Sequence, residues 1–382
     1  MKKKIILLVI ITSLVLTQAV FTESMYSPTW GFYIDLPEGY DFIEGDGRDR
    51  FSFEGPNGLM FDLIVYDNRY NSIRSLIEDV NRRLNNRGDV DFFMYNGKQA
   101  GIMKLTFGNF DGWGIAVEIE NTTGQNPGIQ QKPMLLALSY CPANRRDLEL
   151  FHLSALDSIS PTNAELRYPG PIMEYTYPRG ELRNVTLPNG INTRFHQNDA
   201  EASQEFIERE FAILNFYINT PYLLEASIRY YRSIYRDSYD RIKHATETFM
   251  RHFGGHQFRD EAEKRAFAQR VLTYTQSFNY ERDFSGSDFL NLVTAITENR
   301  ADCDNRAMLF AIILSQANIR SSIMISYHHS HAMGLADLQG AGARFESYGL
   351  QWLVAETTAL VDIGMIAQDQ SDPAHWFAVL FE

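Results

Sequence analysis

The sequence predicts an α+β protein in which a β-rich N-terminal part is followed by a helical segment and a second mixed domain. Short runs of alternating apolar residues, separated by glycine and proline turns, fill residues 26–160. From residue 200 the apolar residues recur every three or four positions, which is typical of helices. A stretch rich in proline, asparagine and glycine, 161–199, is predicted to be a linker with an extended or hairpin piece. A chain of 382 residues is long enough for two or three domains.

One amphipathic helix interrupts the strands of the N-terminal part. Residues 71–86 place apolar side chains at helical spacing, and Asn71 or Ser72 is suited to begin that helix. Strands are expected at 30–36, 51–53, 59–65, 91–95, 99–107, 112–119 and 134–140, and a closing helix at 145–159. This order, with Gly-Phe-x-Ile-x-Leu-Pro-x-Gly at 31–39 and Leu-Asp-Ser-Ile-x-Pro at 156–161, resembles the PsbP-like α/β sandwich. The sequence of this part contains no recognisable acid–base pair, metal cluster or glycine-rich phosphate loop, which favours a binding or positioning module over a second active site.

Residues 1–19 are predicted to be a cleaved signal peptide. Three lysines at 2–4 precede a short apolar run at 5–16, and Thr17-Gln-Ala19 offers a small-x-small cleavage site. We therefore expect a secreted or periplasmic protein without a stable membrane anchor, although an uncleaved anchor reaching Phe21 is the alternative. The net charge of −13 argues against nucleic acid or anionic lipid as partners.

One of the two cysteines stands where a polar loop meets an apolar helix. Asp302 is suited to cap that helix, which places Cys303 in its first turn, where the helix dipole favours a thiolate and lowers the pKa. Apolar residues at 307, 310, 311 and 314 give the helix one apolar face. A lone cysteine is more often a small buried hydrophobe, and a disulfide to Cys141 would exclude a nucleophile.

Two later residues complete a set of catalytic groups. If the segment from His331 and the segment 350–358 are neighbouring strands, period-two alternation allows the His331 imidazole to lie beside the Glu356 carboxylate. Cys303 could then act as a thiolate nucleophile, His331 as acid–base and Glu356 as the acid that fixes the imidazole.

These blocks resemble the transglutaminase-like superfamily of papain-like cysteine enzymes. The family pattern is matched by Ala301-Asp-Cys-Asp-Asn-Arg-Ala307, by His331-Ala332 and by Trp352-Leu-Val-Ala-Glu-Thr-Thr358, and the resemblance spans about 259–382. It implies a papain-like domain with Cys303 as nucleophile, His331 as general base and Glu356 as orienting acid. Ala301 replaces a usual glycine and Asn305 a usual aspartate, so both departures bear on whether the site is active.

Other residues are expected to support this site. The Cys303 backbone N–H would contribute to an oxyanion hole, and the Gln276 amide is a candidate second donor. Asp304 and Trp352 are further supporting candidates, and His329 is the fallback for the base. Histidines in the run 328–331 could chelate zinc or copper, but a metal site normally needs three or four ligands, so no metal is expected. Tyrosines at 231, 235 and 239, in the helical segment 200–258, are expected to form a seam between helices.

The predicted function is that of an exported cysteine enzyme acting on amide bonds, by hydrolysis or by transglutaminase-type acyl transfer. Its expected partner is a protein or peptide substrate in the cell envelope, and this chemistry requires no cofactor. The alternative is a catalytically inactive domain of the same fold that serves as a binding module.

Overall fold

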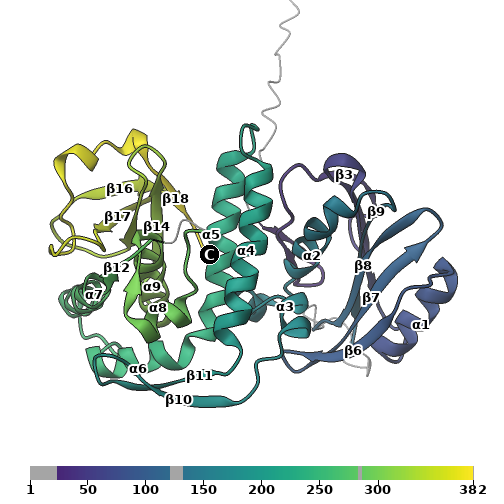
Figure 1. The fold of residues 1–382 in the computed structure, drawn as a ribbon, viewed down its shortest axis with the longest axis horizontal. Helices are drawn as coiled ribbons and strands as arrows, with labels where there is room; N and C mark the ends of the chain where they lie inside the picture. The colour runs from purple at the N-terminus through teal and green to yellow at the C-terminus, as the bar shows by residue number, and fades with distance from the viewer. Residues whose placement is uncertain (1–23, 121–131, 283–285, 382) are drawn as a thin grey trace, which may run out of the picture.

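Two antiparallel sheets, one from each half of the chain, stand on either side of two long helices, α4 (Asp199–Phe216) and α5 (Leu223–Arg241) (Figure 1). The computed structural model describes residues 24–120, 132–282 and 286–381, so the predicted signal peptide lies outside the described residues. The mixture of helices and sheets makes the chain α+β, as the sequence predicts.

The N-terminal sheet has seven strands with a helix on each face. Its strand order is β3 (Asp41–Gly45), β4 (Arg50–Glu54), β5 (Met60–Tyr66), β9 (Met134–Pro142), β8 (Phe110–Glu118), β7 (Lys98–Phe107) and β6 (Val90–Tyr95). Apolar residues of α1 (Ile73–Leu84) cover one face, and α2 (Glu149–Asp157) covers the other. Ser72 caps α1, since its hydroxyl accepts the N–H of Ser75.

Two N-terminal expectations differ from the structure. Residues 30–36 alternate as predicted, with Trp30, Phe32 and Ile34 buried, but only Tyr33–Ile34 forms a strand, β2, paired with β1 (Met25–Tyr26). The helix expected at 145–159 is split into a 3-10 turn, η2 (Arg146–Leu148), and α2.

The linker contains the expected hairpin. After η3 (Asn163–Arg167) and α3 (Pro171–Thr176), β10 (Leu182–Thr186) pairs with β11 (Asn192–His196), and β11 packs on α6 (Lys243–Phe253). The hairpin thus carries the chain from the first sheet to the helices beside the second (Figure 1).

The second sheet has the strand order β16 (Arg344–Ser347), β17 (Leu350–Ala355), β15 (His331–Ala336), β14 (Ser321–Ser326) and β18 (Phe377–Val379). Helices α7 (Glu261–Gln276), α8 (Leu292–Glu298) and α9 (Cys303–Gln316) lie beside it. A short parallel pair, β12 (Asn279–Tyr280) with β13 (Arg300–Ala301), leads into α9.

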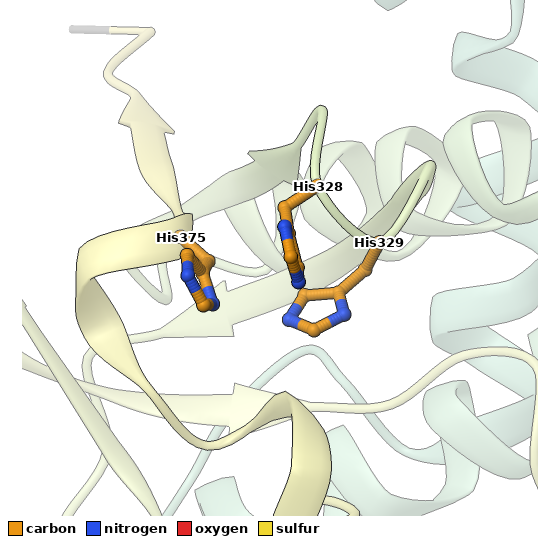
Figure 2. Close-up of side chains that lie close together, drawn as sticks. All are labelled: His328, His329 and His375. Atoms are coloured by element: carbon orange, nitrogen blue, oxygen red, sulfur yellow. The ribbon is translucent and has the colours of Figure 1, made fainter.

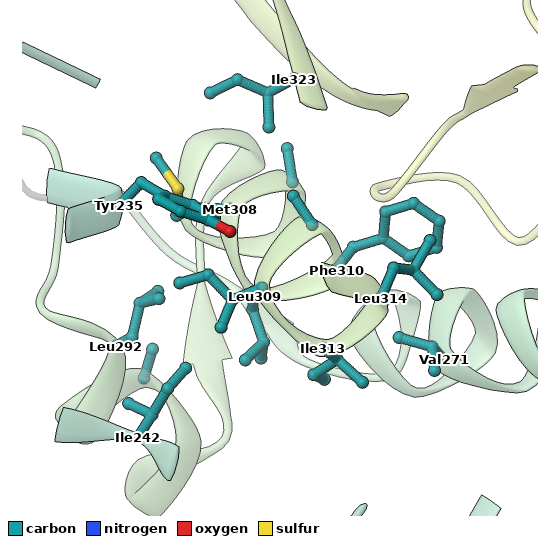
Figure 3. Close-up of a cluster of buried hydrophobic side chains, with 14 of the residues drawn as sticks. Tyr235, Ile242, Val271, Leu292, Met308, Leu309, Phe310, Ile313, Leu314 and Ile323 are labelled. Carbon is teal, nitrogen blue, oxygen red and sulfur yellow. The ribbon is translucent and has the colours of Figure 1, made fainter. Parts of the chain in front are cut away.

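Helix α9 is buried on nearly every side, not on one face as the sequence suggests. Every residue from 305 to 314 is buried, because the sheet covers one side and other helices cover the rest. Figure 3 shows Tyr235, Ile242, Val271 and Leu292 from those helices around the α9 side chains, with Ile323 of β14 on the sheet side. A helix enclosed in this way has little freedom to shift, so its first turn is held firmly against the start of β15.

Buried ion pairs join the two halves of the chain. Arg209 of α4 donates to Asp157 at 2.6 Å, and Arg229 of α5 pairs with Glu38 at 3.5 Å. Nearer the surface, Arg232 pairs with Asp35 at 2.6 Å. Within the three described ranges, no helix combines the length and the apolar character needed to cross a membrane.

Gly334 is predicted to be required because β15 approaches α9 closely. A Cβ added at Gly334 would lie 2.5 Å from Cδ1 of Phe310. We expect Gly334→Ala to reduce the free energy of unfolding by about 1–3 kcal/mol, measured by chemical denaturation.

The matched test is a double-mutant cycle with Phe310→Leu, which removes part of the ring that the new methyl group would strike. The double variant should lose less stability than the sum of the two single losses. Strict additivity would contradict the steric explanation.

Candidate active site

The loop before α9 is fixed by reciprocal bonds across the helix start. Asp302 accepts the backbone N–H of Asn305 at 3.0 Å, and Asn305 accepts the N–H of Asp302 at 3.3 Å. The Asn305 amide also donates to the carbonyl of Leu290 at 2.6 Å, a bond that an aspartate could not make. Ala301 does not adopt a positive φ, so this loop does not require glycine there. Both departures from the family pattern are therefore accommodated.

The Cys303 thiol is buried, with 3% of the residue exposed, and it points at a carboxylate. Its Sγ donates to Oδ1 of Asp304 at 3.2 Å, while Oδ2 of Asp304 accepts the hydroxyl of Tyr231 at 2.6 Å. Burial, then the charges of Asp304 and Asp302, raises the pKa of Cys303 well above its usual value.

The predicted lowering of the Cys303 pKa is therefore wrong for this structure. A helix dipole contributes about 0.3–1 kcal/mol at an exposed site, which is less than the cost of burying a thiolate beside two acids. Burial and the charge of Asp304 also raise the pKa of Asp302 to about 8. Cys303 rests as a neutral thiol.

His331 and Glu356 lie on one face of the second sheet and are bonded to each other. Leu335 pairs with Val354 in the antiparallel register of β15 and β17, which sets the start of β15 beside the end of β17. The His331 Nε2 and the Glu356 Oε2 are 2.8 Å apart. Of the strand registers that the sequence allowed, the structure has the one that brings His331 beside Glu356.

The Glu356 carboxylate is held in its ionised form. Its Oε1 accepts the backbone N–H and the hydroxyl of Thr358, both at 2.6 Å, and the N–H of Ala359 at 3.3 Å. Burial acts to raise the pKa of Glu356, but the bonds from His331 and Thr358 outweigh it and lower the pKa. An ionised Glu356 makes the Nε2–H of His331 the donor and leaves Nδ1 for another partner.

The starts of α9 and β15 bring the thiol and the imidazole into one region. The backbone N–H of Ala332, the residue after His331, lies close enough to the Cys303 sulfur to oppose the rise in its pKa. The charge of His331 acts on Asp304 in the same way. Cys303, Asp304, His331 and Glu356 thus form one cluster of ionisable side chains.

The remaining supporting candidates have other roles. The Gln276 amide donates to the carbonyls of Glu356 at 2.8 Å and Val361 at 2.9 Å, so both amide hydrogens are in use and Gln276 is not a second oxyanion donor. Trp352 is fully buried, and its indole donates to the carbonyl of Ser347 at 3.1 Å, which makes it part of the core behind Glu356. His329 lies in the turn between β14 and β15, so the strand alternation that made it a fallback base does not apply.

The sequence pattern did not indicate the role of Arg306 or the contact of Tyr231 with Asp304. Arg306 is buried and donates to the carbonyls of Phe278 at 2.6 Å, Ala301 at 3.2 Å and Thr357 at 3.4 Å. The sequence does place this permanently charged side chain in an otherwise apolar helix, three residues after Cys303, and that was the available signal. Nothing local to Tyr231 indicated its partner, 73 residues away.

The disulfide alternative does not hold, because Cys141 and Cys303 are both free and buried in different parts of the chain.

A cavity of about 500 Å³ lies away from Cys303, at the junction of the two halves of the chain. Its lining includes Arg209, Arg229 and Arg232, which form ion pairs. Among the described residues, two groups of side chains are close enough to share a metal ion: Asp302, Cys303 and Asp304, and His328, His329 and His375.

Comparison with known proteins gives only distant structural likenesses. No family model matches the sequence, and no curated protein matches it. A candidate cysteine protease from Cytophaga hutchinsonii aligns over 91% of this chain and 78% of its own, with 11% identity and a TM-score of 0.24. A protein from Bacteroides thetaiotaomicron aligns over 83% of this chain and 87% of its own, with 9% identity and a TM-score of 0.22. A candidate protease from Parabacteroides distasonis aligns over 85% of this chain and 70% of its own, with 11% identity and a TM-score of 0.22. Likeness at this level carries no argument about function, which has to come from the geometry.

Removing the charge beside the sulfur should make Cys303 more reactive. The Asp304 carboxylate raises the pKa of the thiol, so Asp304→Asn should lower that pKa and speed alkylation by iodoacetamide at pH 7, by about tenfold for each unit of pKa. The rate is measured by peptide mapping in a Cys141→Ala background. An unchanged or slower rate in Asp304→Asn would contradict the electrostatic role of Asp304.

Arg306 should be far more important for stability than its neighbour Arg300. Arg306→Met removes the Arg306 donor from three carbonyls, of which only that of Ala301 keeps another among the described residues, the N–H of Glu281, and we expect a loss of about 3 kcal/mol or more in the free energy of unfolding. Arg300→Met is the matched control, because Arg300 forms partly exposed ion pairs with Glu281 and Glu298 and should cost below about 1 kcal/mol. Equal losses, measured by urea denaturation, would contradict this account.

Proposed function

We propose that this chain is a cysteine-dependent enzyme that acts on amide bonds of peptides or proteins. In this proposal Cys303 is the nucleophile, His331 the acid–base group and Glu356 the acid that orients the imidazole. The observation that carries it is the 2.8 Å bond between His331 and Glu356 at the start of β15, whose next residue, Ala332, lies close enough to the Cys303 sulfur to act on its pKa. This arrangement supports the grouping of nucleophile, base and orienting acid that acyl transfer requires.

The reaction begins from a neutral thiol. Because Glu356 engages Nε2 of His331, Nδ1 is the nitrogen that accepts the Cys303 proton as the sulfur attacks the carbonyl carbon. A C–S bond forms, and the carbonyl oxygen becomes an oxyanion. Collapse of this intermediate breaks the C–N bond, and His331 returns the proton to the leaving amine. Water then hydrolyses the thioester, or an acceptor amine takes the acyl group.

The first turn of α9 supplies the polar environment for the oxyanion. The Cys303 backbone N–H lies among the first, unpaired donors of the helix, where the dipole favours negative charge. Since Gln276 is committed to two carbonyls, the second donor in this proposal is not Gln276. The chemistry needs no organic cofactor.

The predicted signal peptide supports the location in this proposal. A basic start followed by a short apolar run is typical of exported chains, so we propose that the enzyme is secreted or periplasmic and meets its substrate in the cell envelope.

One observation favours the alternative of an inactive binding module. The Cys303 S–H is bonded to Asp304, and its pKa is raised by burial and by acidic neighbours, as expected of a structural cysteine. The two functions differ in whether His331 controls the reactivity of the sulfur.

Alkylation of Cys303 by iodoacetamide distinguishes them. In a Cys141→Ala background at pH 7, an enzyme should lose at least about tenfold in alkylation rate when His331 is replaced by alanine, because no base then accepts the proton. His256→Ala is the matched control, since His256 is exposed and distant in sequence from the site. A rate that rises only in alkaline solution, and equally in His331→Ala, would establish the binding module instead. Mass spectrometry of peptide products, with and without an added primary amine, then separates hydrolysis from acyl transfer.

A further inference from the structure

Three histidines gather beside the candidate active site without belonging to it. His328 and His329 occupy the turn after β14, and His375 ends η5 (Pro373–His375), just before β18. One nitrogen from each ring lies within 4.8 Å of the others (Figure 2). The rings of His328 and His375 are stacked with centroids 4.0 Å apart, and His329 stands edge-on to His328 at 4.7 Å.

The cluster has an unmet polar atom. Nε2 of His329 is buried, and no hydrogen-bond partner reaches it among the residues that the structure describes. A buried ring nitrogen without a partner is destabilising, and a ligand bound at this point would satisfy it.

We propose that His328, His329 and His375 bind one divalent transition-metal ion, with Zn²⁺ as the first choice. Imidazole nitrogen suits zinc, copper and nickel, and three protein ligands leave a coordination position for water or a fourth group. Zinc–nitrogen bonds of about 2.0–2.1 Å place tetrahedral ligands about 3.3 Å apart. In this proposal, rotation of the side chains brings the three nitrogens from their present spacing, within 4.8 Å of one another, to that value, and the stacked rings of His328 and His375 tilt apart.

The site is open to solvent. His328 is exposed, so an ion can enter from solvent.

The structure separates this site from His331, which the sequence grouped with the other histidines. His331 points to Glu356, while Trp376 lies between the two groups, with ring centroids 6.2 Å from His331 and 5.5 Å from His329. A bound ion would tie the β14–β15 turn to the C-terminal segment and hold Trp376 in place. Because ligation needs none of the proposed catalytic residues, this inference does not depend on the proposed function.

Zinc titration of the tag-free chain tests the site. We expect one Zn²⁺ per chain by calorimetry, with an affinity at least about tenfold weaker in His328→Ala and in His375→Ala. His256→Ala, an exposed histidine elsewhere, should bind as the wild type does. Cys303→Ala should also bind normally, and it controls for the other group of close ligands, Asp302, Cys303 and Asp304. Zinc should raise the melting temperature of the wild type and not of the double variant His328→Ala, His375→Ala.

Three results would overturn the inference. The first is no zinc binding at micromolar concentrations, and the second is an affinity that is unchanged in both histidine variants. The third is binding that survives in His375→Ala but is lost in Cys303→Ala. Co²⁺ provides an independent readout, because a sulfur-to-cobalt charge-transfer band would reveal ligation by Cys303 instead of by imidazole alone.

Discussion

The buried guanidinium of Arg306 is the constraint on which the geometry of the candidate site depends. From one position on α9 it binds the carbonyl after α7, the carbonyl just before Cys303 and the carbonyl just after Glu356. The loop of the proposed nucleophile and the loop of the proposed acid are thereby joined through a single side chain. Three carbonyl dipoles and the ring of Tyr280, whose centroid is 5.4 Å from the guanidinium carbon, compensate the buried charge of Arg306, and displacing any one of them leaves that charge less satisfied. Gln276 secures the acid loop from the other side, through Glu356 and Val361.

The second constraint is how closely β15 can approach α9. Successive residues of the strand face opposite sides, and the side toward the helix carries only Ala332, Gly334 and Ala336. Small side chains let the backbone of the strand come near Phe310, which in turn brings the N–H of Ala332 to the Cys303 sulfur. The opposite face carries Met333 and Leu335 in an apolar cluster with Trp352, and His331 begins that face. His331 and Ala332 therefore have complementary roles. In the proposed reaction His331 is the acid–base group, while the small side chain of Ala332 lets the strand lie close to α9.

Much of this could be predicted from the sequence, because the signals were local or periodic. The helix start at Asp302 and the shared face of His331 and Glu356 follow from capping chemistry and from alternation. Strand β3 was missed because all five of its residues are exposed, so it carries no alternating pattern. The pKa of Cys303 could not be inferred, since it depends on burial by elements distant in sequence and on a carboxylate held by Tyr231. The approach of His375 to His328 depends on the pairing of β18 with β14, a feature of sheet order that no local pattern indicates.

The position of the thiol proton depends on how charge is distributed in the cluster. Transfer from Cys303 to Asp304 would move a negative charge from oxygen to sulfur and gain nothing from a counter-ion. Transfer to His331 creates an imidazolium, which would be costly in a buried site if it stood alone. The ionised Glu356, held by Thr358 and Ala359, stands 2.8 Å from that ring and compensates the new positive charge. In the proposed reaction the thiolate is then paired with an imidazolium whose charge Glu356 compensates, so Glu356 would allow His331 to compete with Asp304 for the proton.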